Sequence, residues 1–523
     1  MKKLIPLISI LLVSAVLLAC SINPVTGKNE FLLVSAIQEV AIGEKNYLPS
    51  QQAQGGPYYI DPDVGRYVSA VGQKLAKASD RPDLPYEFVV LNNSEPNAWA
   101  LPGGKIAINR GLLTHLRDES ELAAVLGHEI VHAAARHSAA QMTRNTFIGA
   151  GAQVLGMAAT ESGYGPLANT AIQIGSAVWL AKYGRGDELE SDAYGMDYMV
   201  RAGYDPQGAV RLQETFVELS KDRNSNFLNS LFASHPPSQE RVDANRKKAA
   251  GMPSGKVRRE QFERHIAQVR KDMPAYRAQN EALKALNEKR LKQALEHLDL
   301  AISLQPRESY FYELRGQAQK MLGQPERAEQ DFSTAISRNP GFFSHYLSRG
   351  VLRFDRGNNS GARADLERSN ALLPTQAANY VLGELSIQVK DMVEAQQYYQ
   401  AAIQGGGELG KRAQSRYTVL ELPKNPSKFI VSQPYVGKDG YLKIAVKNNA
   451  VVKVINVQIQ VDEMAGSYSV ARSANLSGPS HLEPGEQLIV STLIGPFTKD
   501  QVVPVYRTNV IAAQPIEVLN AGH

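Results

Sequence analysis

The chain has 523 residues, more than a single hydrophobic core usually organises, so we expect a multidomain protein with two to four domains. Hydrophobic residues make up 43% of the chain and charged residues 21%, which is typical of a folded globular protein. The net charge of +5 is small for this length, so the composition gives no reason to expect nucleic acid or another polyanion as the main partner.

The first twenty residues differ from the rest of the chain. Lys2 and Lys3 precede an apolar run over residues 4–18, which is short for a membrane span and typical of an export signal. No later segment reaches 18 uninterrupted apolar residues, so we expect the mature chain not to cross a membrane.

The apolar run ends at the only cysteine of the chain. The segment Leu17-Leu18-Ala19-Cys20 resembles a bacterial lipobox, which implies a signal peptide over residues 1–19 and a lipid anchor on the thiol of Cys20. An ordinary signal peptide with a chance cysteine is the alternative. Ser21 stands where an aspartate would indicate retention at the inner membrane, so by this analogy we expect the periplasmic side of the outer membrane.

A helix is predicted from Asp118 to about His137. Asp118 can cap its first turn, and Glu121 three residues later can reach back in a capping box. The apolar face of this helix comprises Leu122, Val125 and Leu126.

This helix carries the segment His128-Glu129-Ile130-Val131-His132. A four-residue step places both imidazoles on one face of the helix, close enough to share a cation. Zinc suits two neutral imidazoles and a carboxylate, with one position left for water. Glu129 lies beside the histidines, where it can take a proton from that water. An accidental pair on a solvated helix is the alternative.

The third ligand is expected from a second predicted helix, which contains Glu188-Leu189-Glu190-Ser191-Asp192. Glu188 and Asp192 are four residues apart, so one can bind the metal while the other orients a histidine. By spacing alone Glu190 competes with Glu188 as the ligand, and the crowded acidic residues also fit a solvated helix face.

Downstream of these helices, residues 271–422 repeat themselves. Four positions recur at a spacing of 34 residues, and a degenerate copy follows at a spacing of 33. The recurring residues are Ala294, Leu298, Ala301 and Pro306; Ala328, Phe332, Ala335 and Pro340; Ala362, Leu366, Ser369 and Pro374; and Ala395, Tyr399 and Ala402. Gly316, Gly350 and Gly383 fall at matching positions in the preceding helix of each copy. The spacing resembles tetratricopeptide (TPR) repeats, which implies an all-α solenoid; a generic helical bundle is the alternative.

The C-terminal residues, 428–523, are predicted to form a small all-β sandwich. Pro423 and Pro426 mark a break after the repeats. Residues 442–446 and 451–461 are apolar runs of strand length with Asn448-Asn449 between them. This region carries no recognisable chemistry.

Several segments together resemble the HtpX-like and prenyl-protease-like zinc metallopeptidases, and within them the BepA-type periplasmic proteases, in which a repeat region also follows the peptidase. The matching segments occur in the family's order over roughly residues 25–250; they are Asn97-Ala98-Trp99-Ala100-Leu101-Pro102-Gly103-Gly104, Asn109-Arg110-Gly111-Leu112-Leu113, Leu126-Gly127-His128-Glu129-Ile130-Val131-His132 with Arg136-His137, residues 185–195, and His235-Pro236-Pro237-Ser238. The resemblance implies that residues 20–270 form an α+β, gluzincin-like peptidase domain that binds one zinc ion.

The resemblance also implies roles for individual residues. The family's third ligand is the glutamate four residues before the aspartate, which maps to Glu188, with Asp192 supporting a histidine. The histidine that matches His235 can occupy the open zinc position as a removable latch, which implies a self-inhibited resting state. His235 could instead stabilise the oxyanion, a role for which Arg185 and Tyr194 are other candidates, or simply fill a buried turn.

A hairpin before the metal-binding helix is a candidate substrate site. Residues 86–91 are predicted to form a strand, and residues 97–101 and 105–109 to form two strands joined by a Gly-rich turn. If residues 97–101 form an exposed edge, an extended substrate can pair with Asn97, Ala98, Trp99 and Ala100, with its scissile carbonyl over the metal. A hairpin that only packs in the core is the alternative.

The sequence therefore predicts a zinc endopeptidase that degrades unfolded or misassembled envelope proteins. Its repeats would bind partners, which could include the outer-membrane assembly machinery. The alternative is a TPR scaffold or chaperone lipoprotein for outer-membrane assembly in which the zinc site is latent. The intact set of His128, Glu129, His132 and Glu188 favours catalysis, because a purely structural site has no need of Glu129.

Overall fold

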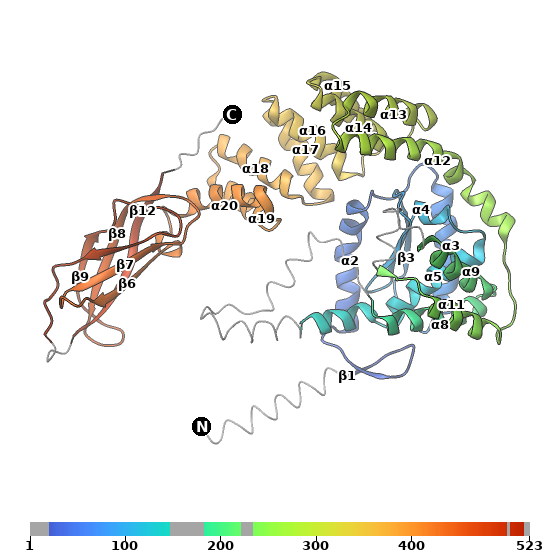
Figure 1. The fold of residues 1–523 in the computed structure, drawn as a ribbon, viewed down its shortest axis with the longest axis horizontal. Coiled ribbons are helices and arrows are strands. Elements are labelled where there is room, and N and C mark those ends of the chain that lie inside the picture. Colours follow the sequence, from blue (N-terminus) through green and yellow to red (C-terminus); the bar gives the residue numbers. More distant parts are fainter. Residues whose placement is uncertain (1–19, 147–182, 221–233, 499–502, 517–523) are drawn as a thin grey trace, which may run out of the picture. The chain divides into compact units, whose positions relative to one another are not determined.

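The computed structural model describes residues 20–146, 183–220, 234–498 and 503–516, so the predicted signal peptide lies outside the described residues. The chain forms two compact units, residues 1–348 and 349–523 (Figure 1). Within the described residues, no helix has both the length and the apolar character needed to cross a membrane.

The first unit contains the peptidase-like region and the first repeats. Its elements in chain order are β1 (Cys20–Ile22), β2 (Asn29–Phe31), α2 (Ala36–Ala53), α3 (Pro62–Lys77), β3 (Glu87–Leu91), β4 (Ala98–Leu101), β5 (Lys105–Asn109), α4 (Arg110–Leu113), α5 (Glu119–Ala134), α8 (Arg185–Arg201), α9 (Gln207–Ser220), α11 (Gln239–Ala249), α12 (Arg259–Asn287), α13 (Leu291–Leu304), α14 (Ser309–Met321) and α15 (Pro325–Arg338).

A three-stranded sheet in the order β3-β5-β4 packs against the long helices. β3 runs parallel to β5, and β4 runs antiparallel to β5, so the predicted strand and the predicted hairpin are both confirmed. The turn between β4 and β5 uses Gly103 and Gly104 at φ values of 78° and 84°, a backbone region that favours glycine. β4 is therefore an edge strand among the described strands, and α5 packs on it.

Only one of the two hydrogen bonds of the predicted capping box forms at the start of α5. Asp118 Oδ1 accepts a hydrogen bond from Glu121 N at 3.0 Å, as predicted. The reciprocal bond of the capping box does not form, because the Glu121 carboxylate accepts from Arg117 N at 2.8 Å and from Arg117 Nε at 2.7 Å instead.

The end of α5 comes earlier than predicted, at Ala134 rather than near His137. Arg136 has a φ of 65°, which interrupts the helix. Its guanidinium is held by Glu39 at 3.0 Å and by Ser21 Oγ at 2.6 Å, so contacts distant in sequence stabilise this turn.

Helix α12 belongs to both the peptidase-like region and the first repeat. Its residues Val269 and Tyr276 lie in one apolar core with Val64 of α3 and Phe311 of α14. The predicted division between residues 270 and 271 falls inside this helix.

The repeat helices pair as expected from the spacing. The remaining helices are α16 (Phe343–Asp355), which runs across the division between the units, α17 (Asn359–Leu372), α18 (Gln376–Gln388), α19 (Met392–Ile403) and α20 (Gly407–Glu421). Each matching glycine faces a large residue of the next helix; a Cβ would lie 2.7 Å from Phe332 at Gly316, 2.8 Å from Leu366 at Gly350 and 2.6 Å from Tyr399 at Gly383. These contacts explain why the small residue recurs.

The C-terminal residues of the second unit form two antiparallel sheets around one apolar core. The elements are a 3-10 turn η3 (Pro426–Lys428), β6 (Ile430–Val436), β7 (Leu442–Asn448), β8 (Val454–Met464), β9 (Val470–Ser477), β10 (His481–Leu482), β11 (Gln487–Ser491) and β12 (Val505–Pro515). One sheet has the order β11-β7-β6, and the other has the order β10-β8-β12 with β9 also paired to β8.

Candidate metal centre

Two helices that cross at a pair of glycines bring the predicted ligands together. A Cβ on Gly127 of α5 would lie 3.1 Å from the carbonyl oxygen of Gly195 in α8, and a Cβ on Gly195 would lie 3.1 Å from His128 N. Because neither residue has a side chain, the helices approach closely enough for His128 and His132 of α5 to meet Glu188 of α8.

Four buried side chains converge on one point: His128, His132, Glu188 and His235. The separations around this group are 3.0 Å between His132 Nε2 and His128 Nε2, 3.2 Å between His128 Nε2 and His235 Nδ1, 3.0 Å between His235 Nδ1 and Glu188 Oε1, and 3.4 Å between Glu188 Oε1 and His132 Nε2. Atoms about 2.0–2.1 Å from a tetrahedral zinc ion would be about 3.3 Å apart. The donor set and its spacing therefore fit a zinc ion.

The outer nitrogens of the two α5 histidines are held by further side chains. His128 Nδ1 lies 2.9 Å from Asp192 Oδ1, so the residue predicted to support a histidine contacts one. His132 Nδ1 lies 2.9 Å from His137 Nδ1, and His137 Nε2 lies 3.2 Å from Glu190 Oε1. Glu190, which competed with Glu188 by spacing alone, thus acts through His137 and does not join the metal group.

Arg241 of α11 is a site residue that the sequence reasoning missed. Its guanidinium is buried and lies 2.8 Å from Glu188 Oε2 and 2.7 Å from Asp192 Oδ2. Two carboxylates buried this close together need a positively charged neighbour. That requirement could have indicated from the sequence that an arginine or lysine belongs to the site. The proposed oxyanion candidate Arg185 is instead exposed and pairs with Glu240 at the surface.

Tyr183 is the second residue that the sequence reasoning missed. Its ring stacks on His132 with 3.7 Å between centroids. Its hydroxyl lies 3.0 Å from Ser138 Oγ and 3.4 Å from the carbonyl oxygen of Ala100. Tyr183 therefore connects a metal-group histidine to the outer edge of β4.

Burial and charge set the ionisation of the group. Burial holds the pKa of His132 well below its usual range, which favours the neutral imidazole that a metal needs. Burial would raise the pKa of Glu188, but His235 and His128 beside it hold that pKa well below its usual range. Burial would likewise raise the pKa of Asp192, and Arg241 lowers it overall.

Glu129 differs from the other carboxylates of the site. Burial raises its pKa, against the opposing effect of His235 and His128, and its Oε2 has no hydrogen-bond partner among the described residues. Its Oε1 lies 3.5 Å from His235 Nε2. A raised pKa and a free oxygen suit a group that takes up a proton.

The space beside Glu129 is small. A cavity of about 30 Å³ is bordered by Ala98, His128, Glu129, His235 and Arg241, among others. This volume is enough for about one or two water molecules and far too small for a peptide. Among the described residues, the space beside Glu129 therefore does not admit a peptide in this conformation.

The predicted substrate strand is an edge strand, but it is not exposed. Asn97, Ala98, Trp99 and Ala100 are each at most 5% exposed, and Tyr183 contacts the Ala100 carbonyl. The strand therefore lies beside the metal group with its outer side covered.

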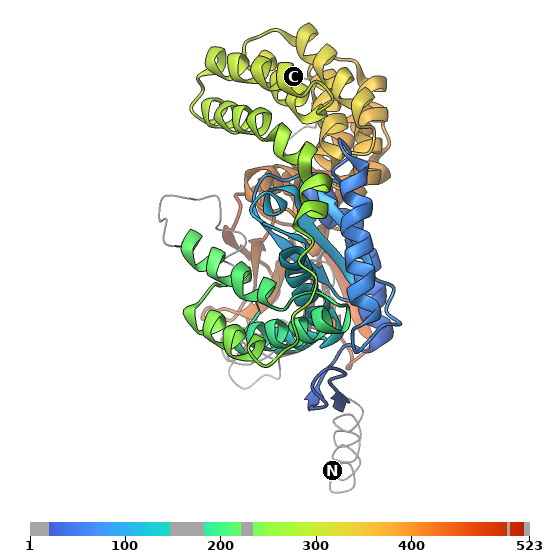
Figure 2. The same ribbon diagram turned by 90° about the vertical axis from the view of Figure 1, so that its right-hand side faces the viewer.

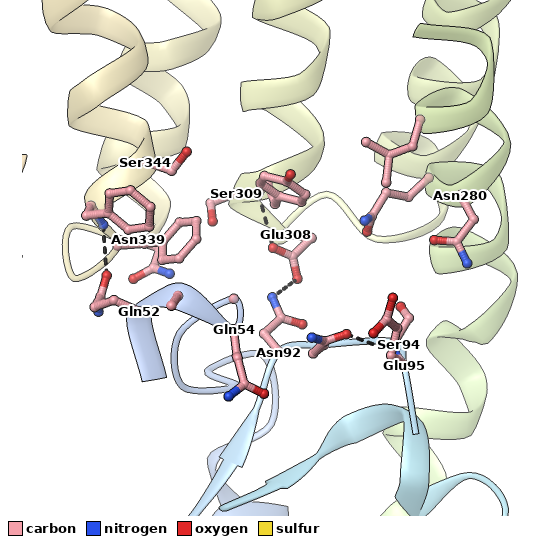
Figure 3. A pocket seen from close by; sticks show the side chains of 18 of the residues that line it. Gln52, Gln54, Asn92, Ser94, Glu95, Asn280, Glu308, Ser309, Asn339 and Ser344 are labelled. Atoms are coloured by element: carbon pink, nitrogen blue, oxygen red, sulfur yellow. Dashed lines mark hydrogen bonds between the residues drawn. The ribbon is translucent and has the colours of Figure 1, made fainter. Parts of the chain in front are cut away.

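A second, larger cavity lies between the peptidase-like region and the first repeats (Figure 3). Its volume is about 900 Å³, and many of its lining side chains are amides; they are Gln52, Gln54, Asn92, Asn93, Gln279, Asn280, Asn287 and Asn339. Glu308 borders this cavity, accepts a hydrogen bond from Asn92 at 2.8 Å and another from Tyr276 at 2.7 Å, and so joins the two regions. Gln52 adds a bond of 2.8 Å to the Gly341 carbonyl.

Two histidines of one helix, a glutamate of a second helix and a free neighbouring glutamate define a centre of the metallopeptidase class. Comparison with known proteins agrees: residues 62–249 match the model of peptidase family M48. The mitochondrial metalloendopeptidase OMA1 of Schizosaccharomyces pombe is 33% identical over 241 residues, which cover 45% of this chain and 68% of that protein. The chain belongs to peptidase family M48, whose members are metallopeptidases.

A second relative and a solved structure show further similarities. The beta-barrel assembly-enhancing protease of Yersinia pestis is 28% identical over 236 residues, which cover 44% of this chain and 47% of that protein. The present chain thus spans about half the length of this relative. The TPR domain of Arabidopsis OM64 superposes with a TM-score of 0.22 at 23% identity, covering 23% of this chain and 98% of that one. The repeat fold is assigned from the helix pairs of this chain and the close contacts of Gly316, Gly350 and Gly383.

Proposed function

We propose that the protein is a zinc-dependent endopeptidase of the bacterial cell envelope that degrades misfolded or misassembled outer-membrane proteins. The observation that carries this proposal is the spacing of His128, His132, Glu188 and His235 beside the free carboxylate oxygen of Glu129. A site that only stabilises the fold has no use for that carboxylate. Within this proposal the peptidase region is gluzincin-like, and the C-terminal sheets are a sandwich.

Each residue around the centre has a distinct task. A zinc ion held by His128, His132 and Glu188 would polarise the scissile carbonyl and make water more acidic. Glu129 takes a proton from the water, and its raised pKa allows it to hold that proton until the leaving amine needs it. Asp192 and His137 fix the orientation of His128 and His132.

His235 acts as a removable latch in this proposal. Its Nδ1 stands at the fourth corner of the donor set, and its Nε2 faces Glu129. A peptide substrate can bind there only after His235 leaves that corner, because the adjoining cavity of about 30 Å³ cannot hold a peptide. The resting enzyme is therefore inactive until a substrate or partner displaces the latch.

An extended substrate is proposed to add to the outer edge of β4, along Asn97, Ala98, Trp99 and Ala100. Backbone pairing there suits unfolded chains, because it does not depend on the substrate's side chains. The Tyr183 hydroxyl has to release the Ala100 carbonyl first, so opening of this edge and departure of His235 belong to one activation step.

The repeats are proposed to bind substrate or assembly partners. The amide-lined cavity of about 900 Å³ supports this role, because amide side chains both donate to and accept from a peptide backbone. A lipid on Cys20 is proposed to hold the protein at the periplasmic side of the outer membrane.

A second function is favoured by the position of His235. With four protein ligands the zinc site would be complete, as structural zinc sites are. The protein would then be a TPR scaffold or chaperone lipoprotein with a latent metal site.

Cleavage of casein by the soluble protein lacking residues 1–20 tests both proposals. We expect cleavage that disappears with Glu129→Gln or a chelator and increases severalfold with His235→Ala. Equal cleavage by Glu129→Gln and the parent would contradict the enzyme proposal. No cleavage even by His235→Ala, with zinc still bound, would favour the scaffold.

A further inference from the structure

We propose that the N-terminal hairpin and the start of α2 form a membrane-contacting surface that rests on the lipid bilayer and holds the metal centre next to it. This inference rests on the proposed anchor at Cys20 and goes beyond it, because a flexible tether would let the protein tumble. We assign to this surface the exposed side chains of Ile22, Phe31, Leu33 and Ile37, and we call it the hairpin face.

The hairpin turns one side toward the protein and the other away from it. β1 and β2 pair antiparallel, with Ser21 opposite Glu30 and residue 20 opposite Phe31. Ser21 Oγ accepts a hydrogen bond of 2.6 Å from Arg136, so its side chain faces the peptidase region. Because side chains alternate along a strand, Ile22 and Phe31 lie on the opposite side.

The hairpin face is unusually apolar for an exposed surface. The exposed fractions are 63% for Ile22, 37% for Phe31, 46% for Leu33 and 83% for Ile37. Eight large apolar side chains are strongly exposed among the described residues up to 348, and these four fall within one stretch of sixteen residues. Such a cluster indicates an interaction surface.

The hairpin is fixed to the end of the metal-binding helix. Asn23 Nδ2 donates to the Ala135 carbonyl at 3.2 Å, and Leu33 N donates to Thr143 Oγ1 at 3.0 Å. Arg136 also donates to the Val34 carbonyl at 2.7 Å. The loop between β1 and β2 and the segment after β2 are thus both held to residues just beyond the C-terminal end of α5.

The bilayer is the occupant that the position of the hairpin face favours. The register partner of Phe31 is residue 20, the proposed site of the lipid, so the proposed anchor point lies next to Phe31 in the hairpin. The hairpin lies at one end of the first unit and α13 to α15 lie at the other, with α2 running between them (Figure 1 and Figure 2). Near the end of α2, Gln52 donates a hydrogen bond to the Gly341 carbonyl. With the hairpin face on the lipid, the first repeats point away from the membrane.

This orientation places the metal centre close to the lipid surface. His132 lies two residues before the end of α5 at Ala134, and Arg136, two residues beyond that end, contacts Ser21 of the hairpin. The protease would therefore act on chains emerging at the membrane surface, and the first repeats would receive them from the periplasmic side.

The test uses the full acylated protein in vesicles of phosphatidylethanolamine and phosphatidylglycerol. Acylation blocks Cys20, the only cysteine, so a cysteine introduced by Ile37→Cys takes up a maleimide fluorophore at one position. Leu48→Cys is the matched control, since Leu48 is 45% exposed on the same helix and about 16 Å farther along it. We expect spin-labelled lipids to quench the probe at position 37 at least twofold and to leave the probe at position 48 nearly unchanged.

Three outcomes would overturn the proposal. Equal quenching at both positions, or none at either, would show that the hairpin face does not rest on lipid. If spin-labelled lipids do not quench the probe at position 37 but its fluorescence changes with protein concentration, the hairpin face binds a second copy of the chain. Reaction of Cys20 with the maleimide in the parent would remove the anchor and the surface proposal with it, whereas casein cleavage by the same samples reports separately on the proposed enzyme.

Discussion

Around the metal group, each ligand is positioned by a second side chain that does not touch the metal position. Asp192 holds His128, His137 holds His132, and Arg241 holds Glu188. Such supporting contacts fix both the orientation and the ionisation of a ligand.

Removal of the Asp192 carboxylate is expected to weaken zinc binding by about 10- to 100-fold, because His128 then loses the acceptor for its outer nitrogen. Competition with a chromogenic chelator measures the affinity of Asp192→Ala. Asp197→Ala is the matched control on the same helix, since Asp197 pairs with Lys248 and not with the metal group. Similar losses in both variants would indicate a general effect on α8.

His235 is expected to make the stability of the chelator-treated protein depend on pH. Burial alone would lower its pKa, but Glu188 and Glu129 raise it to about 9. The unfolded value is about 6.5, so the folded chain binds an additional proton between these pH values. The resulting stabilisation is complete below pH about 6.5 and is lost as pH rises through about 9.

Denaturant unfolding checks this expectation. The free energy of unfolding should fall by at most about 3 kcal/mol between pH 6.5 and 9 in the parent and much less in His235→Gln. A parent curve as flat as that of the variant would contradict the assignment.

The residues that the sequence identified and those that it missed differ in one respect. His128, Glu129 and His132 lie within five residues, so helix geometry alone places them together. Arg241 contacts Glu188 and Tyr183 stacks on His132, each across about 50 residues of the chain, and no local pattern encodes these contacts.

Among the elements, close helix contacts depend on glycines at defined positions. Gly127 and Gly195 allow α5 and α8 to cross, and Gly316 allows α14 to pack on Phe332. The repeat glycines were predictable from their spacing. The crossing of α5 and α8 was not, because two isolated glycines form no pattern.

A methyl group at Gly316 is expected to destabilise the first unit by about 1–3 kcal/mol, since it would lie 2.7 Å from the Phe332 ring. Gly65→Ala in α3 is the matched control, because nothing lies within 4 Å of its Cβ. That control should be neutral or stabilising by up to about 1 kcal/mol. Urea unfolding of both variants gives the comparison, and equal effects would argue against close packing at Gly316.

On the scale of the whole molecule, the first repeats are part of the same folded unit as the peptidase-like region. Tyr276 of α12 donates to Glu308, and its ring lies under Arg110, whose guanidinium carbon is 3.3 Å from the ring centroid. Tyr59 accepts a hydrogen bond of 2.6 Å from Ser309 N. Because these polar contacts join the two regions, we expect no freely moving linker between them.

A fragment of residues 21–270 is therefore expected to fold poorly, because it lacks the second half of α12 and with it Tyr276. A fragment of residues 21–357 keeps α12 to α16 and is expected to retain zinc binding within about tenfold of the full soluble chain. Thermal unfolding and chelator competition on both fragments provide the measurement. A stable, zinc-binding 21–270 fragment would show that the repeats are dispensable for the fold of the metal centre.

The sequence by itself determined the metal-binding motif, the repeat period and the order of the regions, because each follows from spacing along one helix or from a repeated pattern. The tertiary structure decided which carboxylate faces the histidines, since Glu188 and Glu190 differ only in the direction in which α8 presents them. It also decided that β4 is covered and that α12 joins two regions. These features depend on contacts between segments that are distant in the sequence. The free energy of such contacts is set by packing in three dimensions, and they produce no repeating pattern in the sequence.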